Sequence, residues 1–131
     1  MSYYLFLDDT RKPSDVNWVD LPLVEWTIVR DYKQFVDTIK SRGMPEFIAF
    51  DHDLADEHYG YTGEIGRDDE YEEHRKKYKE KTGYECALWV INYCVDNNLK
   101  MCPHVAHSVN PVGRSKINGA FESYKRHLEQ K

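Results

Sequence analysis

Two short acidic clusters in this sequence carry side chains that could do chemistry. The residues concerned are Asp8, Asp9, Asp51, His52 and Asp53. Four carboxylates that share a small volume repel one another unless a cation lies between them. Oxygen ligands of this kind suit Mg²⁺, Mn²⁺ or Ca²⁺, and a histidine favours Mn²⁺, so Mg²⁺ or Mn²⁺ is the expected cofactor. The alternative is that some of these aspartates accept hydrogen bonds from backbone amides in their own loops.

A third polar cluster follows an apolar run near the end of the chain. It supplies the imidazole of His107, the hydroxyl of Ser108 and the amide of Asn110. A histidine with a pKa near neutrality can donate or accept a proton, and the hydroxyl and amide can bind phosphate oxygens. His52 and His107 are therefore the candidate catalytic acid and base. The alternative for each histidine taken alone is a structural role.

Further candidate ligand contacts lie in loops. Arg11 stands three residues after Asp8, where its guanidinium can hold a phosphate or pair with the acidic cluster. Tyr61 and Thr62 open a charged stretch at residues 55–83, which we interpret as an insertion that could cover a binding site. Substrate binding is therefore assigned to Arg11, Tyr61, Thr62, Ser108 and Asn110. Two other arginines, Arg30 and Arg114, are weaker candidates for the same role as Arg11, and a surface position is the favoured interpretation of each.

The elements that must position these side chains can be predicted from hydrophobic patterning. Four short apolar runs are typical of buried strands, and three stretches have helical spacing between them. The strands are expected at residues 3–7, 26–29, 47–50 and 104–108. The helices are expected around residues 32–42 with Gly43 as the C-cap, around residues 87–96, and around residues 117–128 with Ser115 as the N-cap.

Alternating strands and helices predict an α/β fold with a parallel, doubly wound sheet. In the flavodoxin-like strand order 2-1-3-4, the first and third strands are neighbours at the switch point. We therefore expect a three-layer sandwich in which the first two acidic clusters meet at the carboxyl ends of adjacent strands.

Composition limits the remaining possibilities. The 131 residues suit one domain, residues 1–131, with the insertion at 55–83. The net charge of −5 argues against general nucleic-acid binding, and no apolar run is long enough to span a membrane. Three cysteines without a CxxC pair predict neither disulfides nor a zinc site, and together with the absence of a signal-peptide pattern they favour the cytoplasm. The oligomeric state is not predicted.

Four segments together resemble one known family. LFLDDTRKP, FIAFDHDL, TGYECALWVI and HSVNPVG occur in the order found in the cyclic-phosphate processing receiver domain family, a divergent branch of the receiver-like fold. The resemblance implies a receiver-like fold, an acidic metal site, and a role in processing nucleotide-derived cyclic phosphates. It matches Asp8 and Asp9 to the acidic pair. The sequence departs from the expected pattern in two ways. Its insertion is longer than in a minimal family member, and the fifth strand of a classical receiver, with its active-site lysine, is expected to be absent.

Three functions remain open at this stage. The first is a metal-dependent phosphoesterase that opens a cyclic phosphate on a nucleotide or nucleotide-sugar, with metal on the four aspartates and proton transfer by His52 or His107. The second is a noncatalytic module that binds or sequesters such a small phosphorylated ligand. The third is a phosphoacceptor in which Asp51 or Asp53 is phosphorylated, and the expected absence of the lysine argues against it.

Overall fold

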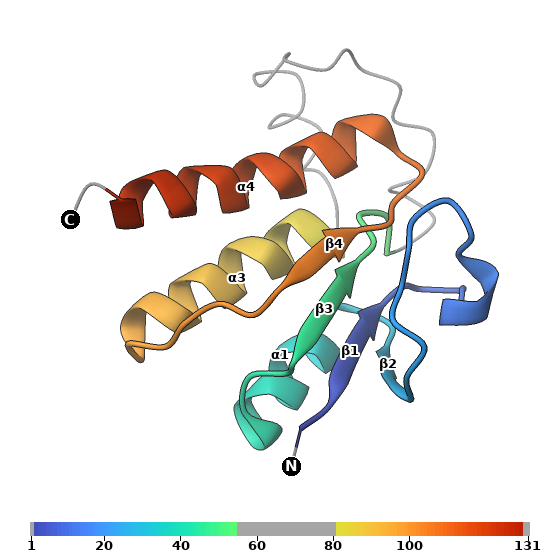
Figure 1. The fold of residues 1–131 in the computed structure, drawn as a ribbon, viewed down its shortest axis with the longest axis horizontal. Coiled ribbons are helices and arrows are strands. Elements are labelled where there is room, and N and C mark those ends of the chain that lie inside the picture. Colours follow the sequence, from blue (N-terminus) through green and yellow to red (C-terminus); the bar gives the residue numbers. More distant parts are fainter. Residues whose placement is uncertain (1, 55–80, 130–131) are drawn as a thin grey trace.

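A four-stranded parallel sheet forms the centre of the molecule (Figure 1). The computed structural model describes residues 2–54 and 81–129. In space the strands follow the order β2-β1-β3-β4, which confirms the predicted order and the receiver-like α/β fold. The strands are β1 (Tyr4–Leu7), β2 (Trp26–Val29), β3 (Phe47–Phe50) and β4 (His104–Ala106).

The first two connections differ from each other. A loop with one 3₁₀ turn, η1 (Pro13–Asp15), joins β1 to β2, whereas helix α1 (Tyr32–Arg42) joins β2 to β3. Asp31 caps α1 because its side chain accepts a hydrogen bond from the backbone N–H of Gln34. Gly43 ends the helix with a φ of 84°, a conformation that glycine adopts without strain, as the sequence predicted.

The two later helices begin earlier than the hydrophobic pattern indicated. Helix α3 spans Gly83–Asp96 and α4 spans Pro111–Glu129. The prediction that Ser115 is the N-cap is therefore wrong, because Ser115 lies inside α4. The N-cap is Asn110, because its Oδ1 accepts hydrogen bonds from the backbone N–H groups of the second and third helical residues. Pro111 occupies the first helical position.

All three described α-helices pack on one face of the sheet (Figure 1). Alternate strand residues such as Leu5, Ile48 and Phe50 point to this face and are fully buried. They form one continuous core with side chains from α1, α3 and α4, including Phe35 and Ile117. The carboxyl ends of the strands are thus held from one side by a rigid helical layer.

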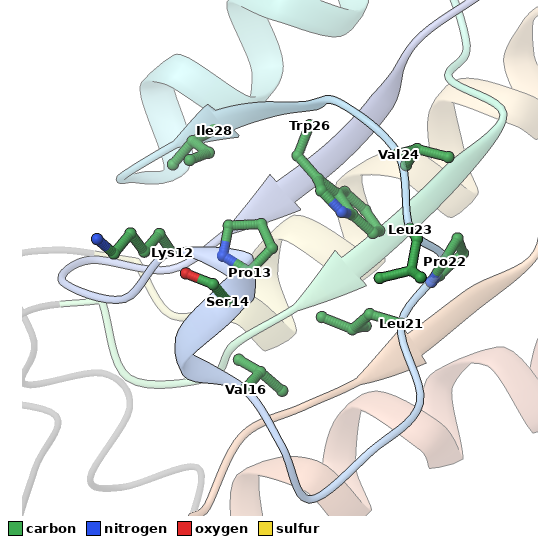
Figure 2. A pocket seen from close by; sticks show the side chains of 10 residues that line it. All are labelled: Lys12, Pro13, Ser14, Val16, Leu21, Pro22, Leu23, Val24, Trp26 and Ile28. Atoms are coloured by element: carbon green, nitrogen blue, oxygen red, sulfur yellow. The ribbon is translucent and has the colours of Figure 1, made fainter.

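The opposite face is covered by the loop that contains η1. Phe6 and Ala49 are buried there together with Val16, in a cluster much smaller than the core on the helical face. Beside it lies a cavity of about 610 Å³, lined by loop residues and by Trp26 and Ile28 of β2 (Figure 2). In the described chain, the third layer of the predicted sandwich is therefore a loop layer rather than a helical one.

The part of the chain that the structure describes contains no helix long and apolar enough to cross a membrane.

Candidate functional site

Strand register brings three buried polar side chains together. Leu7 pairs with Phe50, and Phe50 pairs with Ala106, so the residue after each strand falls at the same level of the sheet. These three residues are Asp8, Asp51 and His107, with exposed fractions of 0%, 2% and 0%. One ligand atom from each lies within 4.8 Å of the others. We call this set the Asp-Asp-His cluster.

Asp8 uses its two carboxylate oxygens differently. Its Oδ1 accepts hydrogen bonds from the backbone N–H groups of Thr10 (3.0 Å) and Arg11 (2.8 Å), which shapes the loop after β1. Its Oδ2 lies 3.0 Å from Nε2 of His107 and 3.8 Å from the guanidinium of Arg11. Burial raises the pKa of Asp8, but the hydrogen bonds from His107 and from the two amides outweigh it and lower the pKa overall. Asp8 therefore both orders its loop and keeps a charged oxygen in the cluster.

Asp51 is the unsatisfied member of the cluster. Its Oδ1 accepts a hydrogen bond from the backbone N–H of His52, but Oδ2 has no hydrogen-bond partner among the described residues. Burial and then the nearby charge of Asp8 raise the pKa of Asp51 to about 8, with smaller contributions from Asp53 and Asp9. A buried carboxylate without a partner is costly, so this oxygen is poised either to hold a proton or to bind a cation.

The cluster fits a divalent cation. Two carboxylates and an imidazole are a common donor set for divalent metals, and the orphaned oxygen of Asp51 supplies the open ligand position. Ligation by Nε2 of His107 would replace its contact with Asp8 and move the ring proton to Nδ1. That atom is buried without a hydrogen-bond partner in the described chain. The two carboxylates are therefore the better-supported ligands.

His52 and Asp53 lie outside the Asp-Asp-His cluster. Nδ1 of His52 contacts the carboxylate of Asp53 at 2.8 Å, and the same carboxylate accepts a hydrogen bond from the side-chain amide of Asn110. The His52 ring also packs against α4 so closely that a Cβ on Gly113 would lie 2.2 Å from its Cγ. The structure thus places these two predicted residues where they tie the loop after β3 to the start of α4. Their predicted catalytic and metal-binding roles stay predictions.

The HSxN motif likewise makes internal contacts. Ser108 is buried, and its hydroxyl accepts a hydrogen bond from the backbone N–H of Asn110. The Asn110 side chain caps α4 with its Oδ1 and donates a hydrogen bond from its Nδ2 to the Asp53 carboxylate. Both side chains therefore stabilise the loop that carries His107. Their predicted contacts with substrate stay predictions.

The remaining predicted residues lie nearer the surface or beyond the described chain. Asp9 is partly buried and does not belong to the Asp-Asp-His cluster, although its charge acts on Asp51. The side chain of Arg11 is 29% exposed and lies beside Asp8, and its predicted contact with substrate stays a prediction. The other two predicted ligand contacts, Tyr61 and Thr62, lie outside the described residues.

Two contributors to the site lie outside the residues assigned to it from the sequence. Arg30 is not a mere surface residue, because its guanidinium donates to the carbonyl oxygens of Asp8 (3.0 Å) and Arg11 (2.6 Å). Trp18 donates its indole N–H to the carbonyl oxygen of His107 at 2.7 Å. The position of Arg30 directly after β2 was a usable signal, because that strand ends beside β1. The contact of Trp18 spans 89 residues and has no local sequence signal.

A comparison with known protein families identifies the chain. The family model of the cyclic-phosphate processing receiver domain matches residues 3–123. This match spans nearly the whole chain, so the chain belongs to that family, and the resemblance found in its motifs is confirmed. No curated protein and no solved structure gave a significant match. The family description associates this receiver-like domain with the processing of cyclic phosphates.

Proposed function

We propose that this member of the family is a metal-dependent phosphoesterase that opens a cyclic phosphate on a nucleotide or nucleotide-sugar. The observation that carries the proposal is the Asp-Asp-His cluster, in which the buried Oδ2 of Asp51 has no partner in the described chain. Its place at the carboxyl ends of β1, β3 and β4 is the usual ligand position in open α/β sheets. Mg²⁺ or Mn²⁺ suits its donors.

The reaction is hydrolysis of one ester bond of the ring. Water adds to phosphorus, one P–O bond to the sugar breaks, and the freed sugar oxygen takes a proton, which leaves a phosphomonoester. A divalent cation at the cluster would supply polarisation of the phosphoryl oxygens and a lower pKa for water. Among the chain's own groups, Asp8 and Asp51 provide the negative charge that retains the cation, and Arg11 neutralises the phosphate from the exposed side.

His107 is the proposed proton carrier. Its Nε2 lies within the cluster and 3.0 Å from Asp8, whereas the ring of His52 is held by Asp53 and packed against Gly113. A proton on Nε2 can therefore be stabilised by a carboxylate that is itself kept charged. His52 acts in this scheme as a positioning residue for the loop after β3.

The test is a panel of nucleoside 2′,3′-cyclic phosphates followed by ³¹P NMR in Mg²⁺, in Mn²⁺ and in EDTA. We expect conversion of the ring phosphate to a monoester with metal and none in EDTA. Asp51→Asn removes the open ligand and should abolish turnover, whereas Asp37→Asn on the exposed face of α1 should leave it unchanged. Failure of the wild type to turn over any ligand with metal present would contradict the proposal.

One observation favours a second function, a noncatalytic module that binds the same ligands. All three cluster residues are almost fully buried, which limits direct contact between His107 and a substrate. In that case a cyclic nucleotide should raise the melting temperature of the protein and be recovered chemically intact. Recovery of the monoester instead would exclude this second function.

A further inference from the structure

Trp18 is a large aromatic side chain that is fixed in place yet 39% exposed. Its indole N–H donates to the carbonyl oxygen of His107, a cluster residue, and the guanidinium carbon of Arg11 lies 5.1 Å from the ring centroid. An exposed tryptophan forgoes the favourable free energy of burying its apolar surface, and here a hydrogen bond also restricts its rotation. The ring is therefore held beside the candidate site by these two contacts.

The other two tryptophans have evident packing roles. Trp26 makes edge-to-face contacts with Tyr4 and Phe47, and Trp89 stacks on Tyr93 with ring centroids 4.9 Å apart. In the described chain, the ring contact of Trp18 is with the cation of Arg11 rather than with another aromatic ring. Its ring thus keeps an aromatic surface available for a flat partner.

Arg11 connects this aromatic ring to the cluster. The same guanidinium that lies over the Trp18 ring has its Nη1 3.8 Å from Oδ2 of Asp8. A phosphate at the cluster would meet Arg11, and a planar group attached to that phosphate through a sugar would come next to Trp18. This order of groups, phosphate and then an aromatic base, is the order in a nucleotide.

We propose that Trp18 is the base-stacking residue of the site and that the ligand is a nucleoside cyclic phosphate rather than a base-free sugar phosphate. The inference rests on the proposed function and adds to it the residue that contacts the base. Stacking on an indole is tolerant of base identity, because every base has an aromatic face. The subsite therefore selects for the presence of a base and discriminates only weakly between bases.

The test compares two ligands on matched variants. The ligands are adenosine 2′,3′-cyclic phosphate and methyl riboside 2′,3′-cyclic phosphate, which lacks the base, and the readout is Kd, or KM where turnover occurs. We expect Trp18→Ala to weaken the adenosine ligand about 10-fold and to leave the base-free ligand unchanged, as loss of one stacking contact predicts. Trp18→Phe, which keeps a stacking ring, should stay within about 3-fold of the wild type.

The controls separate stacking from a structural effect. Leu23→Ala removes another exposed apolar side chain from the loop between β1 and β2 and should change neither affinity. If Trp18→Ala weakens both ligands equally, the indole only positions His107, and the subsite is wrong. If it weakens neither, the subsite is wrong and the proposed function stands. If the wild type binds neither ligand with metal present, the proposed function fails and the subsite with it.

Discussion

The two faces of the sheet support the candidate site in different ways. On one face, α1, α3 and α4 form a continuous core with the strands, and α3 and α4 approach the loop after β3 so closely that glycine is required. On the other face, a loop with one 3₁₀ turn covers a small cluster and leaves Ile28 of β2 38% exposed. The helical face packs against the backbone of Asp51 through Gly83. The loop face holds the ring of His107 against Phe6 and supplies Arg11 and Trp18.

This difference indicates a division between positioning and recognition. The groups that would hold a cation need fixed geometry, and they are almost fully buried. The groups proposed to contact the ligand are partly exposed and are held by a few hydrogen bonds, such as those from Arg30. Substitutions on the helical face should therefore alter stability most, and substitutions on the loop face should alter ligand affinity most.

The largest effect is expected from a matched pair of isoleucines, one on each face. Ile48→Ala removes a fully buried side chain from the helical face and should lower the unfolding free energy by about 2–5 kcal/mol. Ile28→Ala on the loop face should cost less than about 1 kcal/mol, because that side chain is already partly exposed. Urea denaturation measures both. Equal losses would contradict the contrast between the faces.

The next effect is a pH dependence that originates at Asp51. Its folded-state pKa of about 8 lies above its unfolded value, so the unfolded chain releases the proton first as pH rises. In EDTA the unfolding free energy should therefore fall between about pH 4 and pH 8, by at most about 1.4 kcal/mol per pH unit. Asp51→Asn should flatten this slope.

Metal should oppose the loss of stability that Asp51 causes as pH rises. Mg²⁺ or Mn²⁺ binds the charged carboxylate, so the rise in melting temperature caused by metal should grow as pH increases toward 8. Asp51→Asn should remove the rise. If the unfolding free energy measured in EDTA still falls with pH in Asp51→Asn, a group other than Asp51 causes that fall.

A smaller effect is expected from two glycines of α4 that differ only in their surroundings. Gly113→Ala would place a Cβ 2.2 Å from the ring of His52 and should cost about 1–3 kcal/mol. Gly119→Ala meets no atom within 4 Å and should be neutral or stabilise the helix by up to about 1 kcal/mol. Thermal melting of both variants checks the difference. Two equally stable variants would contradict the close approach of α4 to the loop after β3.

The smallest effect on stability is expected on the loop face. Arg30→Gln removes two hydrogen bonds to carbonyl oxygens of the loop after β1 and should cost about 1 kcal/mol. Because that loop carries Arg11, ligand affinity should fall more than stability does. Arg126→Gln, on an exposed part of α4, is the matched control and should change neither quantity. An Arg30→Gln variant with unchanged affinity would show that the loop needs no such support.

Much of this architecture could be predicted from local sequence patterns. The short apolar run at 47–50 and the helical spacing from Tyr32 to Ile39 reflect burial periods that hold within one element. Parallel pairing then brought Asp8 and Asp51 together, because residues after adjacent parallel strands share one edge. The start of α4 was missed although the Asn110-Pro111 pair is a recognisable N-cap signal.

Other features depend on contacts that no local pattern encodes. Residues 8–25 form a loop layer rather than a helix, because their sequence has no helical period. The contact of this loop with the sheet through Val16 could not be predicted from the sequence. The contact between the His52 ring and the Asp53 carboxylate depends on how closely α4 packs against the His52 ring. The separation of the Asp-Asp-His cluster from Asp53 follows from side-chain direction, which residue spacing alone does not determine.

The most direct test of the central claim is anomalous diffraction from a crystal soaked in Mn²⁺. We predict a peak bounded by Asp8, Asp51 and His107, with ligand distances of about 2.0–2.3 Å to the carboxylates, and loss of this peak in Asp51→Asn. A well-ordered cluster with no anomalous peak, or a peak that persists in Asp51→Asn, would contradict it.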